Sequence, residues 1–95
     1  MQINYTAEAF NSLFQLVNYI ETTNTAGAGV RWLNRYESFL QDKLSNPHKI
    51  KLCNNFTFNQ LSLRCIYYND WLIAFSIHKE FVLIEVLLHK SRINN

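Results

Sequence analysis

The chain has 95 residues, of which 48% are hydrophobic and 15% aromatic, with two glycines and one proline. This length and composition predict one packed domain over residues 1–95 with little linker, and they argue against a disordered chain. The formal net charge of +2 is too small to indicate by itself a protein that neutralises many phosphates.

Residues 2–5 alternate loosely between apolar and polar and predict a short strand ahead of a first helix. Thr6 is a good N-cap for that helix, and Glu8 then stands in the first turn, where a negative charge favours the helix dipole. Apolar residues recur at spacings of three and four, which predicts that one helix face lies on a core. These residues are Phe10, Leu13, Phe14, Val17 and Ile20.

A second helical pattern follows the turn-forming segment 21–29 and predicts a hairpin of two helices. The pattern ends at Asn46, because the residue before Pro47 is pushed out of the helical region. Its apolar positions are Val30, Leu33, Tyr36, Leu40 and Leu44.

The rest of the chain is rich in β-branched and aromatic residues and predicts strands. The strand segments are KIKLC (49–53), LSLRCIYY (61–68), WLIAFSIH (71–78) and FVLIEVLLH (81–89). Short connections at Asn69-Asp70 and Lys79-Glu80 predict two consecutive hairpins. The predicted fold is α+β, in the order β-α-α-β-β-β with one further possible strand, and the two-helix hairpin packs on one face of an antiparallel sheet.

Two-residue loops would pair Tyr68 with Trp71 and His78 with Phe81, and this register assigns each side chain to a face. A slip of one residue in either loop would exchange the two sets. The face predicted to lie under the helices carries Ile66, Tyr68, Trp71, Ile73, Phe75, Val82, Ile84, Val86 and Leu88. The other face, partly polar and suited to a partner or substrate, carries Cys65, Tyr67, Ala74, Ser76, His78, Glu85 and His89, mixed with Leu63, Leu72 and Leu87.

The sequence contains no nucleotide-binding loop, GxSxG or HExxH motif, so we expect no nucleotide, metal or other cofactor. Cys53 and Cys65 lack CxxC or Cys/His ligand spacing, and we expect them to be two buried free thiols. The N-terminus lacks the features of a secretory signal, and no stretch approaches the length that spans a bilayer. A cytoplasmic location without a membrane partner is therefore predicted.

Several polar and aromatic residues are candidates for function. Arg64 interrupts an apolar strand and should point toward the helices, where an ion pair with Glu21 or Glu37 is favoured over a functional role. Two of the three aromatics around the first turn should face the core, which disfavours stacking on bases. The three aromatics are Tyr67, Tyr68 and Trp71. For His48 and His78 we expect surface or structural roles.

Polar residues gather where the last strand leaves the sheet, in the run His89, Lys90, Ser91 and Arg92. This run is either a solvated strand end or a functional cluster. The segments LRCIYYNDWLIAF and VLLHKSRIN resemble the C-terminal strands of the ParE/RelE superfamily, toxins of type II toxin-antitoxin pairs of the plasmid-stabilisation type. In that superfamily the closing strand often ends in His-Gly-Ser/Ala-Arg, so Lys90 stands where glycine is usual.

On this resemblance, Arg64 aligns with the arginine of the family's Leu-Arg step. His89, Ser91 and Arg92 align with the His, the small residue and the Arg of the terminal motif. RelE-type members cut messenger RNA on the ribosome with basic side chains on the open sheet face. At the positions of their sheet arginines this chain has Tyr67 and Ser91. The remaining basic substitutes are Lys49, Lys51, His89, Lys90 and Arg92.

The resemblance therefore favours the ParE branch, whose members poison DNA gyrase by binding it. It implies a cognate antitoxin as partner, and the chain would form either a homodimer or a toxin-antitoxin hetero-oligomer. The implied target-binding residues are Arg64, Tyr67, His89, Lys90, Ser91 and Arg92, and the catalytic candidates in an enzyme would be His89 and Arg92. The alternatives are a ribosome-dependent endoribonuclease acting on messenger RNA and a binding module that has lost toxicity.

Overall fold

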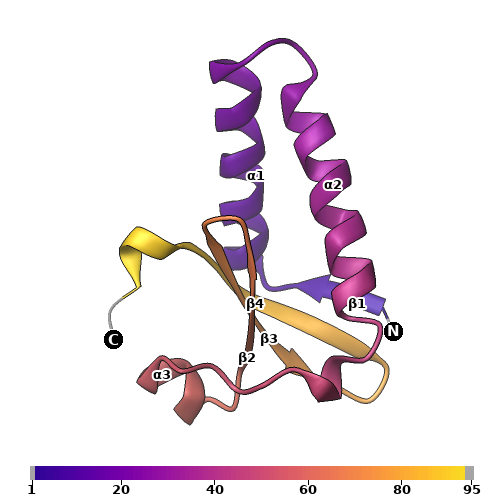
Figure 1. The fold of residues 1–95 in the computed structure, drawn as a ribbon, viewed down its shortest axis with the longest axis vertical. Coiled ribbons are helices and arrows are strands. Elements are labelled where there is room, and N and C mark those ends of the chain that lie inside the picture. The colour runs from indigo at the N-terminus through magenta and orange to yellow at the C-terminus, as the bar shows by residue number, and fades with distance from the viewer. Residues whose placement is uncertain (1, 94–95) are drawn as a thin grey trace.

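The computed structural model describes residues 2–93. Two long helices, α1 and α2, form a hairpin that stands on one face of a four-stranded sheet, and the loop end of the hairpin extends beyond the sheet (Figure 1). The elements in chain order are β1 (Gln2–Tyr5), α1 (Ala7–Thr23), α2 (Ala28–Lys43), η1 (Pro47–Lys49), α3 (Phe56–Gln60), β2 (Arg64–Tyr68), β3 (Trp71–Ile77), β4 (Phe81–His89) and η2 (Lys90–Arg92).

The sheet has the strand order β1-β4-β3-β2. Strands β2, β3 and β4 are antiparallel neighbours, but β1 pairs parallel with β4, so that Ile3 lies opposite Val82. The α+β class and the order of the main elements are confirmed, whereas the expectation of an antiparallel sheet is wrong, because the sheet is mixed. A parallel pair needs a long crossover connection, and the helical hairpin and the β-hairpins together supply it.

The predicted strand KIKLC does not form. Its first residue belongs to the short helix η1, and Leu52 makes one isolated bridge to Arg64. The chain then turns into α3, which the sequence analysis did not predict and which begins where the Asn55 side chain accepts a hydrogen bond from the Phe58 amide at 3.1 Å. Segment 50–63 is therefore a cover over the sheet and not a fifth strand.

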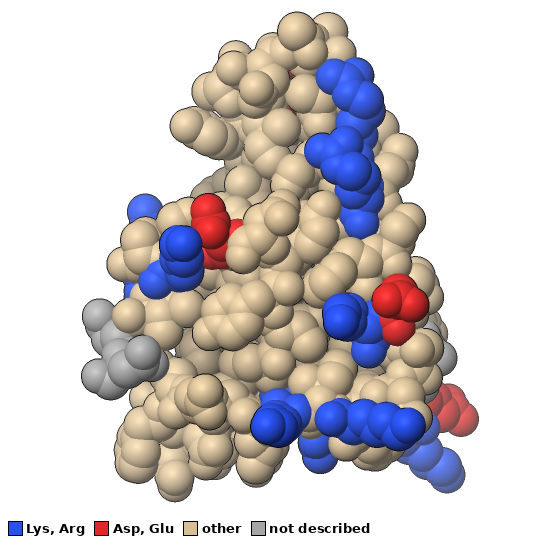
Figure 2. Space-filling view, in the orientation of Figure 1, with Lys and Arg blue, Asp and Glu red and all other residues tan. Residues whose placement is uncertain are grey.

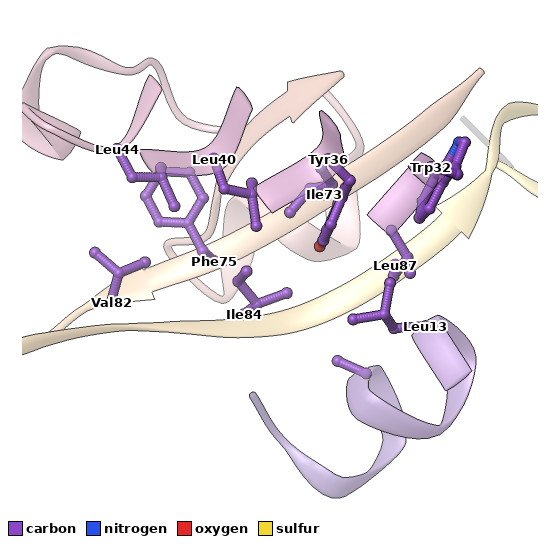
Figure 3. Packing of buried hydrophobic residues seen from close by; sticks show 11 residues of the cluster. Leu13, Trp32, Tyr36, Leu40, Leu44, Ile73, Phe75, Val82, Ile84 and Leu87 are labelled. Carbon is purple, nitrogen blue, oxygen red and sulfur yellow. The ribbon is translucent and has the colours of Figure 1, made fainter. Parts of the chain in front are cut away.

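The main core lies between the helical hairpin and the sheet (Figure 3). Tyr36 is fully buried there, stacks on Trp32 and shares a 3.0 Å hydrogen bond between its hydroxyl and that of Tyr5. Burial raises the pKa of both phenols. Side chains from both layers meet in this core, among them Leu13, Leu40, Leu44, Ile73, Phe75, Val82, Ile84 and Leu87.

The predicted apolar faces of the two helices are only partly buried. Leu13, Tyr36 and Leu40 are in the core as expected, whereas Phe10 and Phe14 are each 56% exposed. The sheet lies against the line through Ala9, Leu13 and Leu16, which places Phe10 and Phe14 on the flank of α1. Val30 is likewise exposed, whereas Trp32, which is not among the predicted apolar positions, is buried in the core.

Both predicted hairpins form with two-residue loops. Tyr68 pairs with Trp71, and the His78 amide donates to the Phe81 carbonyl at 2.8 Å. The aromatics of the first turn also lie as expected: Tyr68 and Trp71 pack against the core, and Tyr67 is 58% exposed.

A β-bulge in β4 overturns the face assignment near the end of that strand. Phe75 pairs with Ile84 but Ala74 pairs with Val86, so that Glu85 is the extra residue. Beyond the bulge, the side chains predicted for one face lie on the other. Leu87 and His89 lie on the helix-covered face, opposite Ile73 and Trp71, while Val86 and Leu88 lie on the second face.

The second face of the sheet is partly covered by segment 50–63. Cys53 and Leu63 are buried against Ala74, with Phe58 and Val86 packed beside them. The expectation of two free thiols is contradicted, because the sulfur atoms of Cys53 and Cys65 are bonded to each other. The Cys53 amide donates to the Leu63 carbonyl and the Cys65 amide donates to the Lys51 carbonyl. These bonds bring the Cα atoms of Cys53 and Cys65 to 4.9 Å, within the range that a disulfide needs.

Candidate functional site at the exit of the last strand

A cavity of about 450 Å³ lies between α1 and the end of β4, and we refer to it as the strand-exit cleft. One wall is a side face of α1. Leu13 and its neighbours bury the adjacent face of this helix in the core, so the side face is left to border the cavity. That wall consists of Ser12, Gln15, Leu16 and Tyr19. The opposite wall consists of Trp71, Leu87, Leu88, His89, Ser91 and Arg92.

The His89 side chain is held by the turn that follows it. Its Nδ1 accepts a hydrogen bond from the Ser91 backbone amide at 3.2 Å and lies 2.9 Å from the Ser91 hydroxyl. Since Nδ1 accepts from an N–H group, the proton of the neutral ring is on Nε2. The Trp71 ring packs edge-on against the imidazole, with 5.2 Å between centroids. His89 is therefore fixed in both position and tautomer.

Lys90 points away from the cleft. Its ammonium lies 3.0 Å from an Asp70 carboxylate oxygen, and its backbone amide donates to the Asp70 carbonyl at 2.8 Å. Both side chains are exposed, so the ion pair contributes little to stability. The backbone hydrogen bond is what joins the strand exit to the turn between β2 and β3.

Arg92 supplies the positive charge of the cleft. No Asp or Glu lines the cavity, and among residues 2–93 no carboxylate pairs with Arg92. Figure 2 shows Lys and Arg elsewhere on one face of the molecule in separate groups, one of them over α2.

The other two sequence candidates lie outside the cleft. Arg64 does point toward the helix-covered face, but it donates to the carbonyls of His48 and Ile50, and the expected ion pair with Glu21 or Glu37 is absent from residues 2–93. Tyr67 is on the second face of the edge strand β2. The structure therefore brings together His89, Ser91 and Arg92 and separates them from Arg64 and Tyr67.

Glu21, one of the two partners proposed for Arg64, has a different role. Its carboxylate accepts hydrogen bonds from the backbone amides of Gly27 at 2.7 Å and Gly29 at 2.9 Å, at the start of α2. These two bonds lower the pKa of Glu21. The helical hairpin is thus closed by a charged cap.

Sequence analysis did not identify the α1 wall of the cleft. Ser12, Gln15 and Tyr19 belong to no motif, and their helical spacing indicates only a polar flank. The side of the sheet on which His89 lies depends on the bulge at Glu85, which no sequence signal marked.

No protein-family model matches the chain. No curated protein matches it either. Within residues 2–93, no helix has both the length and the apolar character to cross a membrane. The same residues contain no group of three or more His, Cys, Asp or Glu side chains placed to hold a metal ion.

Proposed function

We propose that this chain is the toxin of a type II toxin-antitoxin pair, with a ParE/RelE-like fold, and that it arrests growth by binding DNA gyrase. The support is the element order, the resemblance of LRCIYYNDWLIAF and VLLHKSRIN, and a strand exit that carries His89, Ser91 and Arg92 at the surface. A cognate antitoxin would cover this exit and so block access to gyrase.

The lack of Lys and Arg on the second face of β2, β3 and β4 favours binding over RNA cleavage. Arg64 is the only Lys or Arg in β2, β3 and β4, and it bonds to carbonyls on the helix-covered side. Part of the second face is closed by Cys53 and Leu63. A ribonuclease of the RelE type needs cations there to stabilise the charge that develops on the phosphorane. This distribution of charge is the observation that carries the proposal.

A supercoiling assay tests the proposal. Purified chain is added in increasing amounts to gyrase, ATP and relaxed plasmid, and the topoisomers are resolved on a gel. We expect the supercoiled product to fall as the chain is added, while relaxation by an ATP-independent topoisomerase continues unchanged. Undisturbed supercoiling at a large molar excess of the chain would refute gyrase as the target.

One observation favours a second function, a ribosome-dependent endoribonuclease. Tyr19, His89 and Arg92 line one cavity, and phenol, imidazole and guanidinium groups can supply proton transfer and phosphate binding. Primer extension on translated messages from expressing cells separates the two functions. Cleavage that His89→Ala or Arg92→Ala abolishes would place the ribonuclease first.

Both targets place the proposed toxin in the cytoplasm, where thiols are generally kept reduced. The disulfide between Cys53 and Cys65 would have to persist there. Cys53 is 1% exposed, which limits attack by reducing thiols at its sulfur, whereas Cys65 is partly exposed.

A further inference from the structure

We infer that the strand-exit cleft binds the carboxylate of an acidic side chain, carried by an otherwise apolar segment of a protein partner. The inference rests on the proposed function for the identity of that partner, the antitoxin. The binding itself is argued from the charge, hydrogen-bonding groups and shape of the cleft.

The charge around the cleft is unbalanced in favour of an anion. Arg92 lines the cavity without a carboxylate partner among residues 2–93. The nearby carboxylate of Asp70 is engaged by Lys90 at 3.0 Å. A guanidinium binds a carboxylate through two parallel hydrogen bonds, so one acidic side chain would complete this site.

The number of charges favours a carboxylate over a phosphate. Among residues 2–93, Arg92 is the only Lys or Arg that lines the cleft. Ser12, Gln15 and Tyr19 lie within α1, where backbone amides are used in the helix and no free helix N-terminus is offered. A dianionic phosphate would find one full positive charge here, whereas a monoanionic carboxylate is matched by it.

The neutral groups around Arg92 suit the backbone and the apolar side chains of a partner segment that carries the carboxylate. The Gln15 amide can donate to a carboxylate or peptide oxygen, while the Ser12 hydroxyl already donates to the Glu8 carbonyl at 3.1 Å and offers only its lone pairs. The apolar walls come from Leu16, Leu87 and Trp71. The volume of about 450 Å³ is that of a typical ligand pocket and admits one acidic side chain with part of its apolar neighbours.

The test uses a pair of blocked tripeptides of nearly the same shape, of which only the first carries a carboxylate: acetyl-Leu-Asp-Leu-amide and acetyl-Leu-Asn-Leu-amide. Each is titrated into the full chain labelled with ¹⁵N, and the signals of the Gln15 side-chain amide and the Trp71 indole are followed by NMR. We expect the Asp peptide to bind about tenfold more tightly than the Asn peptide, as a charge-assisted hydrogen bond requires. Shifts should be confined to residues that line the cleft.

Two charge-matched variants locate the interaction. Arg92→Gln should remove the preference for the Asp peptide, whereas Lys90→Gln, which removes an adjacent charge already paired with Asp70, should change its affinity by less than about twofold. Equal affinities for the two peptides, equal losses in the two variants, or shifts outside the cleft would overturn the inference.

The same preparation separates this inference from the proposed function. A chain that prefers the Asp peptide through Arg92 but leaves gyrase unaffected keeps the carboxylate site and refutes the gyrase proposal. A chain that inhibits gyrase but shows no preference for the Asp peptide keeps the gyrase proposal and refutes the carboxylate site.

Discussion

Trp71 and His89 lie opposite each other across β3 and β4, and their rings meet nearly at right angles, with 83° between the planes. This contact exists because the bulge at Glu85 shifts the end of β4 by one residue. Without the bulge, His89 would be on the second face, away from α1. With it, the end of β4 and α1 enclose one cleft.

The start of α1 is tied to the same bulge. Thr6 accepts a 3.1 Å hydrogen bond from the Ala9 amide as the N-cap, and its backbone amide donates to the Ile84 carbonyl at 3.0 Å. We predict that Thr6→Ala lowers the free energy of unfolding by about 1 kcal/mol. Urea denaturation measures the loss, and Thr22→Ala, which changes an exposed threonine at the other end of α1, should cost less. Equal losses would show that the cap contributes nothing.

Gly29 allows the two helices to approach each other closely. A Cβ atom there would lie 2.8 Å from the Val17 carbonyl oxygen and 3.1 Å from the Glu21 Cβ. We predict that Gly29→Ala destabilises the fold by about 1 kcal/mol or more, because the clash exceeds the gain in helix propensity. The control is Val30→Ala at an exposed position of the same helix, which should be close to neutral. A stabilised Gly29→Ala variant would contradict the close packing.

Glu21 makes stability depend on pH. Its folded-state pKa is lowered by the amides of Gly27 and Gly29, while 4.5 is its ordinary value. The stabilisation is therefore complete above the ordinary value and is lost as the pH falls through the lower, folded-state pKa. We predict that Glu21→Gln is less stable than the parent chain at neutral pH and that the difference shrinks as the pH falls progressively below 4.5. Urea midpoints of both chains measure this, and a difference that is constant with pH would exclude the charged cap.

The disulfide fastens the cover to β2 across a separation of 12 residues. We predict that replacing both Cys53 and Cys65 by serine lowers the free energy of unfolding by about 3 kcal/mol, chiefly by freeing the unfolded chain. Denaturation of the oxidised parent and of the double variant measures the loss. The denatured, unreduced parent should show no thiol that reacts with Ellman's reagent, and two reactive thiols would refute the bond.

Local signals predicted most of the secondary structure. Thr6, the two helical periodicities and the short loops around Asn69 and Lys79 each act within a few residues, and the corresponding elements form. KIKLC has strand composition, but Asn55 begins α3 soon after it and Cys53 packs against the second face of the sheet. Its composition was overridden by packing on the second face.

Features that depend on distant residues could not be predicted. The bulge at Glu85 changes which side of the sheet carries His89, and one inserted residue in a strand leaves no local mark. The pairing of Cys53 with Cys65 depends on how the cover crosses β2. Likewise, Phe10 and Phe14 satisfy the helical period but lie beside the stripe that the sheet buries.

The most direct test of the proposed function is gyrase inhibition by the parent chain and two variants that each remove one positive charge. Arg92→Gln changes the cleft, and Lys79→Gln changes an exposed residue in the turn between β3 and β4. We predict that the parent and Lys79→Gln suppress supercoiling equally and that Arg92→Gln requires about tenfold more protein for the same effect. Full supercoiling in the presence of excess parent chain, or equal inhibition by all three chains, would contradict the proposal that this protein binds gyrase through the strand exit.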